Sequence, residues 1–320
     1  MKNDNIGIDG VELTFELDKE NLRRLSDRYN LLNEQGRIFG SVEVLRRKVN
    51  VKFNSPKYVR ENNLIPFSRN DFIKLNSMWL CLERQLSALF GDLSKCRLKN
   101  IECNITLKIV GRCALSQVLD LINRSFTDTV NVVYEGVSAK CKYMKEKQSL
   151  IIKVKNYFTL KIYNKTLEAM RKGISAEEGL LRIEIVMLDR TIKRLFSGRV
   201  PNLCELLCQK SLRLFIKEYK RIFSQGILEK YIKPCLSDIT NILHESLHET
   251  GNPKDTIVLL SGIIVDQEVY RRALCRWYRD RGFAPQRARR NADNQIFRLK
   301  KYGLPQDVIA TIKAFNQLCK

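Results

Sequence analysis

The sequence predicts an α+β fold with a helical C-terminal region. Segments in which apolar and polar residues alternate recur up to Val186, and segments with apolar residues at helical spacing separate them. From Asp189 onward the pattern is helical. Strand–strand–helix units occur once before Gly91 and once after it, which suggests two similar halves.

These patterns also predict the domain organisation. We expect an α+β domain over residues 1–198, with halves at 1–93 and 94–198. A helical connector over 199–250 and a basic helical region over 251–320 follow it. Asn252-Pro253 marks the boundary between these two parts, because proline interrupts a helix.

The first half is expected to begin with strands and to end with a long helix. Apolar residues recur at helical spacing between Ser68, a candidate N-cap, and Gly91, a candidate helix stop. The expected elements are a strand at 11–17, a short amphipathic helix at 19–32, one or two strands within 40–53 and a helix at 68–90.

The second half repeats short strands, and helices follow it. Strands are expected at 98–109, 130–134, 149–154, 157–168 and 180–186, with a helix at 115–123 and a lysine-rich hairpin at 140–147. Later helices are expected at 191–196, 202–223, 228–247 and 255–280, then one up to residue 301 and one from 303.

The composition indicates a polyanionic partner. The chain has 57 Lys and Arg against 35 Asp and Glu, a net charge of +22, which is far more than solubility requires. Nucleic acid and an anionic membrane surface are both possible partners on charge alone. There is no apolar run long enough to span a membrane and no signal-peptide core, so we expect a cytoplasmic protein without a membrane role. Its ten cysteines are then expected to be reduced thiols.

One stretch carries groups suited to phosphodiester chemistry. It reads Ile-Tyr163-Asn-Lys165-x-x-Glu168 and, further on, Leu-Arg182-Ile-Glu184-Ile. Strand alternation places Tyr163 on the face opposite Ile162, and Glu184 on the face opposite Ile183. A hydroxyl nucleophile, oxygen ligands for a hard cation and positive charge for a phosphate would therefore converge.

These residues resemble two families of replication proteins. The pattern is similar to that of the Rep-trans rolling-circle initiators of staphylococcal plasmids and to that of the gene II replication protein of filamentous phages. A third segment lies upstream in the same order, Asn100-Ile101-Glu102, with Glu102 where the families have aspartate and Asn100 where they have arginine. The resemblance covers residues 95–198, and the families' fold implies an antiparallel-sheet nicking core here.

The resemblance implies a specific activity, the nicking of one DNA strand at a replication origin. Tyr163 would be the nucleophile and would leave a 5′-phosphotyrosyl link and a free 3′-OH. Glu102, Glu168 and Glu184 would bind Mg²⁺ or Mn²⁺, and Lys165 would neutralise the phosphate. The implied partners are double-stranded and single-stranded DNA, a host helicase and a host polymerase. A separate helicase is needed because the chain has no Walker loop.

The C-terminal region predicts a second nucleic-acid surface. Between Tyr270 and Lys301 there are eleven Arg or Lys and only two Asp. Arginine makes bidentate phosphate contacts, and the aromatic residues could stack on bases. The expected DNA-contacting residues are Arg271, Arg272, Arg279, Arg287, Arg289 and Arg290. A solvated basic face, and a nucleic-acid-binding protein without catalysis, are the alternatives.

The two histidines offer competing hypotheses. His244-Glu245-Ser-Leu-His248 matches the HExxH pattern of zinc peptidases, with Glu268 where a third ligand would lie. Gly251-Asn-Pro253 ends the helix directly after it, which favours a chance occurrence. Alternatively, the two histidines could form a structural zinc site with two cysteines, Cys204 and Cys208.

Overall fold

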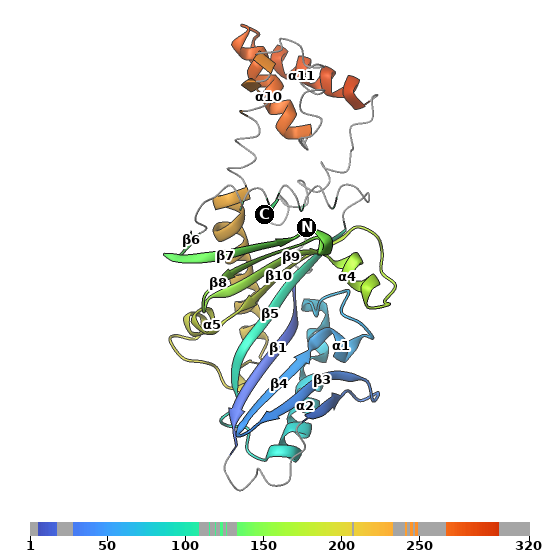
Figure 1. Cartoon of the computed structure of the whole chain (residues 1–320), viewed down its shortest axis with the longest axis vertical. Coiled ribbons are helices and arrows are strands. Elements are labelled where there is room, and N and C mark those ends of the chain that lie inside the picture. The colour runs from blue at the N-terminus through green and yellow to red at the C-terminus, as the bar shows by residue number, and fades with distance from the viewer. Residues whose placement is uncertain are drawn as a thin grey trace.

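The protein has an α+β fold built on one antiparallel sheet. The computed structural model describes residues 6–17, 28–108, 133–206, 208–232 and 267–300, with single positions between 115 and 126 and between 241 and 248. Ten strands pair in the order β2-β3-β4-β1-β5-β10-β9-β8-β7-β6 (Figure 1). Every pair is antiparallel, which confirms the fold class expected from the sequence.

The elements follow one another along the chain much as the periodicity predicts. The first half contains β1 (Gly7–Glu16), β2 (Arg28–Leu32), β3 (Ile38–Leu45), β4 (Lys48–Asn54), α1 (Ser55–Val59), η3 (Arg69–Lys74) and α2 (Leu75–Phe90). The second half contains β5 (Arg97–Lys108), β6 (Val133–Tyr134), β7 (Val137–Met144), η4 (Lys145–Lys147), β8 (Ser149–Val154), β9 (Phe158–Asn164), α4 (Lys165–Arg171) and β10 (Leu180–Met187). Helical elements follow: α5 (Asp189–Leu195), α6 (Leu203–Leu206), α7 (Gln209–Arg221), η5 (Ile222–Ile232), α10 (Gln267–Asp280) and α11 (Pro285–Lys300).

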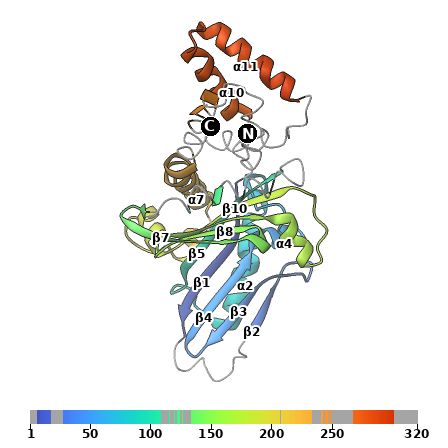
Figure 2. The ribbon, with the colours of Figure 1, turned by 45° about the horizontal axis from the view of Figure 1, so that its top comes forward.

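The two halves share one strand order. From the central β1–β5 pair, β4, β3 and β2 follow on one side, and β10, β9 and β8 follow on the other. In each half the first strand is therefore central, and the last strand in sequence lies beside it. The sheet twists strongly between the two halves (Figure 2).

Helices cover one face of the sheet. Leu75 of α2 and Leu212 of α7 line one small apolar cavity with Leu13 and Ile101 of the central strands. The phenol of Tyr219 in α7 also donates to the Ile183 carbonyl of β10 at 3.0 Å. Because side chains alternate along a strand, the neighbours of these core residues point to the opposite face, which carries the polar site.

Three sequence expectations about the elements need correction. Residues 28–32 of the expected helix at 19–32 form the edge strand β2, because Leu31 packs in the sheet core beside β3. Residues 18–27 lie outside the described residues. The expected helix at 68–90 begins with the 3₁₀ turn η3, so that α2 starts at Leu75. The strand expected at 157–168 ends at Asn164, whose side chain caps α4 by accepting from the Leu167 amide.

The C-terminal helices α10 and α11 pack against each other. Gly282, at φ +82°, lies in the turn between them. Their buried residues are apolar: Ala273, Leu274, Trp277, Ala288 and Ala292. In both views this helix pair lies beyond one end of the sheet (Figures 1 and 2). The helix expected from residue 303 lies outside the described residues. Across the described part of the chain, every helix is too short or too polar to cross a membrane.

Candidate active site

Three neighbouring strands bring the candidate site residues together on the open face of the sheet. In the β9–β10 ladder Tyr163 lies opposite Arg182, and Lys161 lies opposite Glu184. In the β5–β10 ladder Glu102 lies opposite Val186, which is two residues from Glu184 and on the same face of β10. The side chains of Glu102, Tyr163 and Glu184 therefore share one face, as strand alternation predicts.

Glu184 is the centre of this group. Its side chain is only 5% exposed. The Tyr163 hydroxyl donates to Glu184 Oε2 at 3.2 Å. Lys161 Nζ donates to the other carboxylate oxygen of Glu184 and lies 3.8 Å from Glu102 Oε2. One carboxylate thus contacts both the tyrosine hydroxyl and a lysine that also faces the second glutamate.

The charge state of Glu102 depends on its surroundings. Burial, together with the Glu184 and Asp9 carboxylates, raises the pKa of Glu102 to about 9. The Glu184 side chain adds to this shift because it lies beside Glu102. These surroundings favour the protonated form of Glu102 at neutral pH, and the nearby Lys161 ammonium opposes them only in part.

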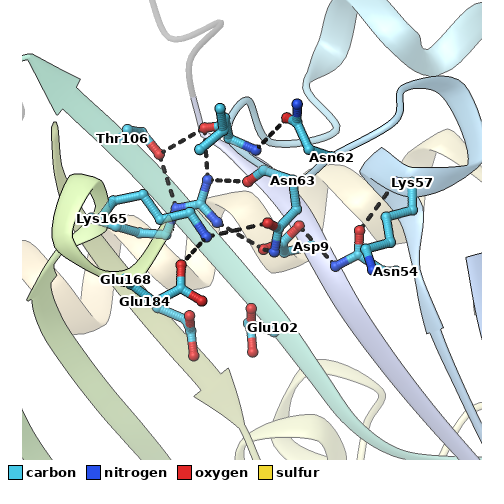
Figure 3. A network of polar contacts seen from close by, with 12 residues as sticks. Asp9, Asn54, Lys57, Asn62, Asn63, Glu102, Thr106, Lys165, Glu168 and Glu184 are labelled. Atoms are coloured by element: carbon cyan, nitrogen blue, oxygen red, sulfur yellow. Dashed lines mark hydrogen bonds and ion pairs between the residues drawn. The ribbon is translucent and has the colours of Figure 1, made fainter. Parts of the chain in front are cut away.

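A buried polar network that the sequence analysis did not single out lies beside the carboxylates (Figure 3). Arg182, whose side chain is fully buried, donates to Asp9 Oδ2 at 3.0 Å and to Thr106 Oγ1 at 3.0 Å. It also donates to the backbone carbonyls of Asn63 and Leu64. The network therefore ties β1, β5 and β10 to the loop between α1 and η3.

Asp9 reaches this network through an irregularity in β1. The β1–β5 register shifts between Ile8 and Val11, so that Asp9 and Gly10 lie in a bulge. A Cβ on Gly10 would lie 3.5 Å from Glu102 Cβ, so the bulge brings the β1 backbone close to the site. Burial raises the pKa of Asp9 above its ordinary value, and Arg182 opposes that shift. In the sequence, the only sign of this role is an aspartate next to a glycine at the start of a strand.

Lys165 and Glu168 lie on α4 rather than on a strand. The Lys165 side chain is 2% exposed, and its Nζ donates to Glu168 Oε2 at 2.6 Å and to Asn63 Oδ1 at 3.2 Å. Glu168 also pairs with Lys172. Burial and the nearby Arg182 lower the pKa of Lys165. In this arrangement Lys165 holds Glu168, and its expected role in neutralising a bound phosphate stays a prediction.

Tyr163 is half-buried, and its surroundings favour the protonated phenol. Burial raises the pKa of Tyr163 well above its ordinary value, and the Glu184 carboxylate adds to the shift. Glu168 and Glu102 act in the same direction. A neighbouring cation would be needed to make this phenol nucleophilic.

The residues on the open face fit a hard divalent cation. Asn104 lies opposite Glu184 in the ladder and on the same face as Glu102. Its side-chain oxygen and nitrogen are both buried without a hydrogen-bond partner. Two carboxylates with one raised pKa and an orphaned amide oxygen form a donor set of hard oxygens, as Mg²⁺ and Mn²⁺ prefer. Lys161 supplies positive charge to the same carboxylates.

Glu168 is less closely associated with this donor set than the sequence analysis expects. Figure 3 shows Glu102, Glu168 and Glu184 turned toward the same region. Their ligand oxygens, however, do not all lie within 4.8 Å of one another, and Glu168 is engaged by two lysines. Glu102 and Glu184 are the carboxylates that face each other most closely.

The arginines expected to contact DNA lie on α10 and α11. Arg272, Arg279, Arg287, Arg289 and Arg290 are exposed. The Arg287 guanidinium stacks 5.2 Å from the centre of the Phe283 ring. Arg271 differs from the others, since it forms a two-point ion pair with Asp293, with Nε 2.5 Å from Oδ1.

The histidines have a different partner from those considered in the sequence analysis. Both His244 and His248 contact Asp280 at the end of α10. Cys208 instead bonds to Ser211 and to the Glu205 carbonyl. The side chains of Glu268 and Cys204 lie outside the described residues.

The chain shows little similarity to known proteins. No family model matches it, and no curated protein matches it. Among solved structures, it is similar to a rolling circle replication initiator protein from Geobacillus stearothermophilus. The two share 11% sequence identity with a TM-score of 0.32, over 71% of this chain and 85% of the other. A similarity this distant carries no argument about the function of this chain.

Proposed function

We propose that this protein is a metal-dependent DNA-nicking enzyme that starts rolling-circle replication, with Tyr163 as its nucleophile. The observation that carries the proposal is the contact of the Tyr163 hydroxyl with Glu184, beside a second carboxylate, Glu102, on the adjacent strand. A phenol with a neighbouring proton acceptor and a cation site is the arrangement that tyrosine transesterification needs. The net charge of +22 supports a polyanionic substrate.

The reaction proceeds by exchange of one phosphoester for another. The Tyr163 oxygen forms a bond to the scissile phosphorus, and its proton passes to the Glu184 carboxylate that accepts its hydrogen bond. The bond between phosphorus and the 3′-oxygen breaks, and that oxygen takes up a proton as it leaves. The products are a 5′-phosphotyrosyl link and a 3′-OH, which a host polymerase can extend.

Glu102, Glu184 and the Asn104 side-chain oxygen would hold the cation. When bound, Mg²⁺ or Mn²⁺ supplies Lewis-acid polarisation of the phosphate and charge that favours the phenolate. Two carboxylates are enough, because Mg²⁺ in phosphoryl-transfer sites keeps waters and takes its remaining ligands from the substrate. Glu168, held by Lys165, contributes negative charge nearby and becomes a ligand only if it leaves Lys172.

A groove on the open face offers a path for single-stranded DNA. It extends from Glu102 over β1, β2, β3 and β4, and its charged lining residues besides Glu102 are Glu12, Arg28, Lys52 and Lys57. Duplex DNA at the origin would be bound by the arginines of α10 and α11, and a host helicase would separate the strands. Contacts of these cationic residues with phosphates would position the strand, and the acidic site at Glu102 and Glu184 would be where it is cleaved.

A nicking assay with matched tyrosine variants tests the proposal. Full-length protein would be incubated with Mg²⁺ and a mixture of random single-stranded oligonucleotides, and with a supercoiled plasmid that carries the gene and its flanks. We expect cleavage with DNA covalently attached to the protein, and loss of both with Tyr163→Phe. Tyr157→Phe, which removes a hydroxyl from the residue directly before β9, should leave both intact.

The assay also separates the alternatives. An adduct that maps to Tyr157 or to another tyrosine contradicts the assignment of Tyr163. DNA binding without cleavage by the wild-type protein, on every substrate and with either Mg²⁺ or Mn²⁺, would favour a nucleic-acid-binding protein without catalysis.

A further inference from the structure

Three side chains that the nicking site does not use converge where a helical turn meets α10. His244 and His248 are one helical turn apart, so both project from the same face. His244 Nε2 lies 2.7 Å from Asp280 Oδ2, and His248 Nε2 lies 3.4 Å from the same oxygen. Among the described residues, these three form the only group of at least three His, Cys, Asp or Glu side chains whose ligand atoms all lie within 4.8 Å of one another.

We propose that His244, His248 and Asp280 bind a Zn²⁺ ion that joins the helical connector to the arginine-rich helices. Zinc binds imidazole nitrogen and carboxylate oxygen at about 2.0–2.1 Å in a tetrahedron, which separates two ligand atoms by about 3.3 Å. The 3.4 Å separation already has this value, and the 2.7 Å separation reaches it through a small side-chain rotation. A water molecule would take the fourth position.

The backbone around the site is already aligned by other contacts. Arg276 donates to Asn241 Oδ1 at 3.0 Å, and these two residues lie one turn before Asp280 and His244, respectively. Leu247 and Trp277, which lie next to His248 and near Asp280 in the sequence, are buried. The Arg276–Asn241 contact therefore joins the two helical segments beside the site, so that an ion would find its ligands partly preorganised.

The site is open enough for an ion to reach it. The His244 side chain is 10% exposed, whereas those of His248 and Asp280 are 44% and 45% exposed. Two of the arginines near Asp280 are occupied elsewhere: Arg281 stacks 4.1 Å from the centre of the Trp277 ring, and Arg276 bonds to Asn241. Both guanidinium groups are thus held by partners other than the proposed ligands.

This site differs from both zinc sites that the sequence suggests. The third ligand is Asp280, which neither the peptidase pattern nor the cysteine pairing includes. The ligands come from segments more than 30 residues apart, His248 and Asp280 being separated by 32 positions. An ion that joins two such segments stabilises the packing of the helices, as structural zinc does.

Metal binding by full-length protein without a histidine tag tests the site. After treatment with a chelator, the protein would be titrated with Co²⁺, whose visible absorption reports tetrahedral coordination, and Zn²⁺ would then be used to displace it. We expect one Co²⁺ per chain, displaced by one Zn²⁺. His248→Ala and Asp280→Asn should each weaken binding by about 100-fold or more, since loss of a second-shell partner alone costs 10–100-fold.

Glu245→Gln is the matched control. It lies in the same helical turn, is exposed and is not a proposed ligand, so it should bind Co²⁺ as the wild type does. Unchanged binding in Asp280→Asn, or loss of binding only when Cys204 and Cys208 are replaced, would overturn the site. Preference for Fe²⁺ over Zn²⁺ would overturn the identity of the ion. Nicking is a separate readout, since His248→Ala should still nick with Mg²⁺ if the proposed function holds.

Discussion

At the scale of single residues, the carboxylates of the open face are arranged to attract a cation. Glu102 and Glu184 lie side by side, and Lys161 contacts both. Burial lowers the pKa of Lys161, but Glu184 and Glu102 outweigh it and leave that pKa above its ordinary value. The lysine therefore stays charged and stabilises the buried carboxylates, and a bound divalent ion would stabilise them further.

The raised pKa of Glu102 predicts a distinctive dependence of stability on pH. Because the folded state keeps this proton up to a pH of about 9 while the unfolded state releases it near pH 4.5, the free energy of unfolding should fall as pH rises between these values. In urea unfolding with EDTA, the free energy of unfolding should fall by at most on the order of 1 kcal/mol per pH unit over this range. Glu102→Gln should remove this fall. Equal slopes for wild type and variant would contradict the buried, protonated carboxyl.

The buried ion pair predicts a large loss of stability when one partner is removed. Asp9→Asn leaves the fully buried Arg182 guanidinium without its counter-charge, which should cost roughly 3–5 kcal/mol in urea unfolding. Asp189→Asn is the control, since it breaks an exposed pair with Lys193 and should cost at most about 0.5 kcal/mol. Similar losses in both variants would mean that Arg182 finds other partners.

The sequence predicts some of these residues and misses others for physical reasons. Tyr163 and Glu184 lie in strands with regular alternation, so their shared face follows from local periodicity. The position of the Asp9 side chain depends on a bulge in β1 and on the pairing of β1 with a strand about 90 positions later. Neither feature produces a local sequence pattern. Asn104 is an ordinary strand residue until its neighbours across the ladder are known.

At the scale of elements, the distinction between strand and helix decides the role of α4. Asn164 ends β9 and caps α4. Lys165 and Glu168 therefore lie in the helix, outside the strand ladder, and pair with each other. A sequence with Tyr, Lys and Glu at short spacing reads equally well as one long strand. The capping asparagine is the signal that could have placed the boundary.

The arginines of α11 predict a salt-dependent contribution to DNA binding. Arg287, Arg289 and Arg290 are exposed, so replacing all three by alanine should weaken binding and reduce the slope of log K against log salt concentration by roughly one unit per lost phosphate contact. Replacing them by lysine keeps the charge and should preserve that slope while losing bidentate contacts. An unchanged slope in the alanine variant would show that this face does not contact DNA.

At the scale of the whole molecule, the two halves form one sheet through the central β1–β5 pair. Neither half has a complete set of neighbours alone, since β1 and β5 would each become an exposed edge. The buried residues of both halves belong to one continuous core. The buried residues of the α10–α11 pair, such as Ala273 and Trp277, lie outside that core.

This division predicts two unfolding transitions that the two tryptophans can report separately. Trp79 lies in α2 and Trp277 in α10, so Trp277→Phe and Trp79→Phe each leave one reporter. In urea, the Trp79 signal should change together with the loss of strand circular dichroism, because both halves share one core. The Trp277 signal should change at lower urea concentration, because two helices with a small core bury less apolar surface than the sheet does.

If the zinc site exists, Zn²⁺ should shift only the Trp277 transition to higher urea concentration, since a ligand stabilises the unit that binds it. A single transition for both reporters would instead show that the helix pair and the sheet unfold as one unit.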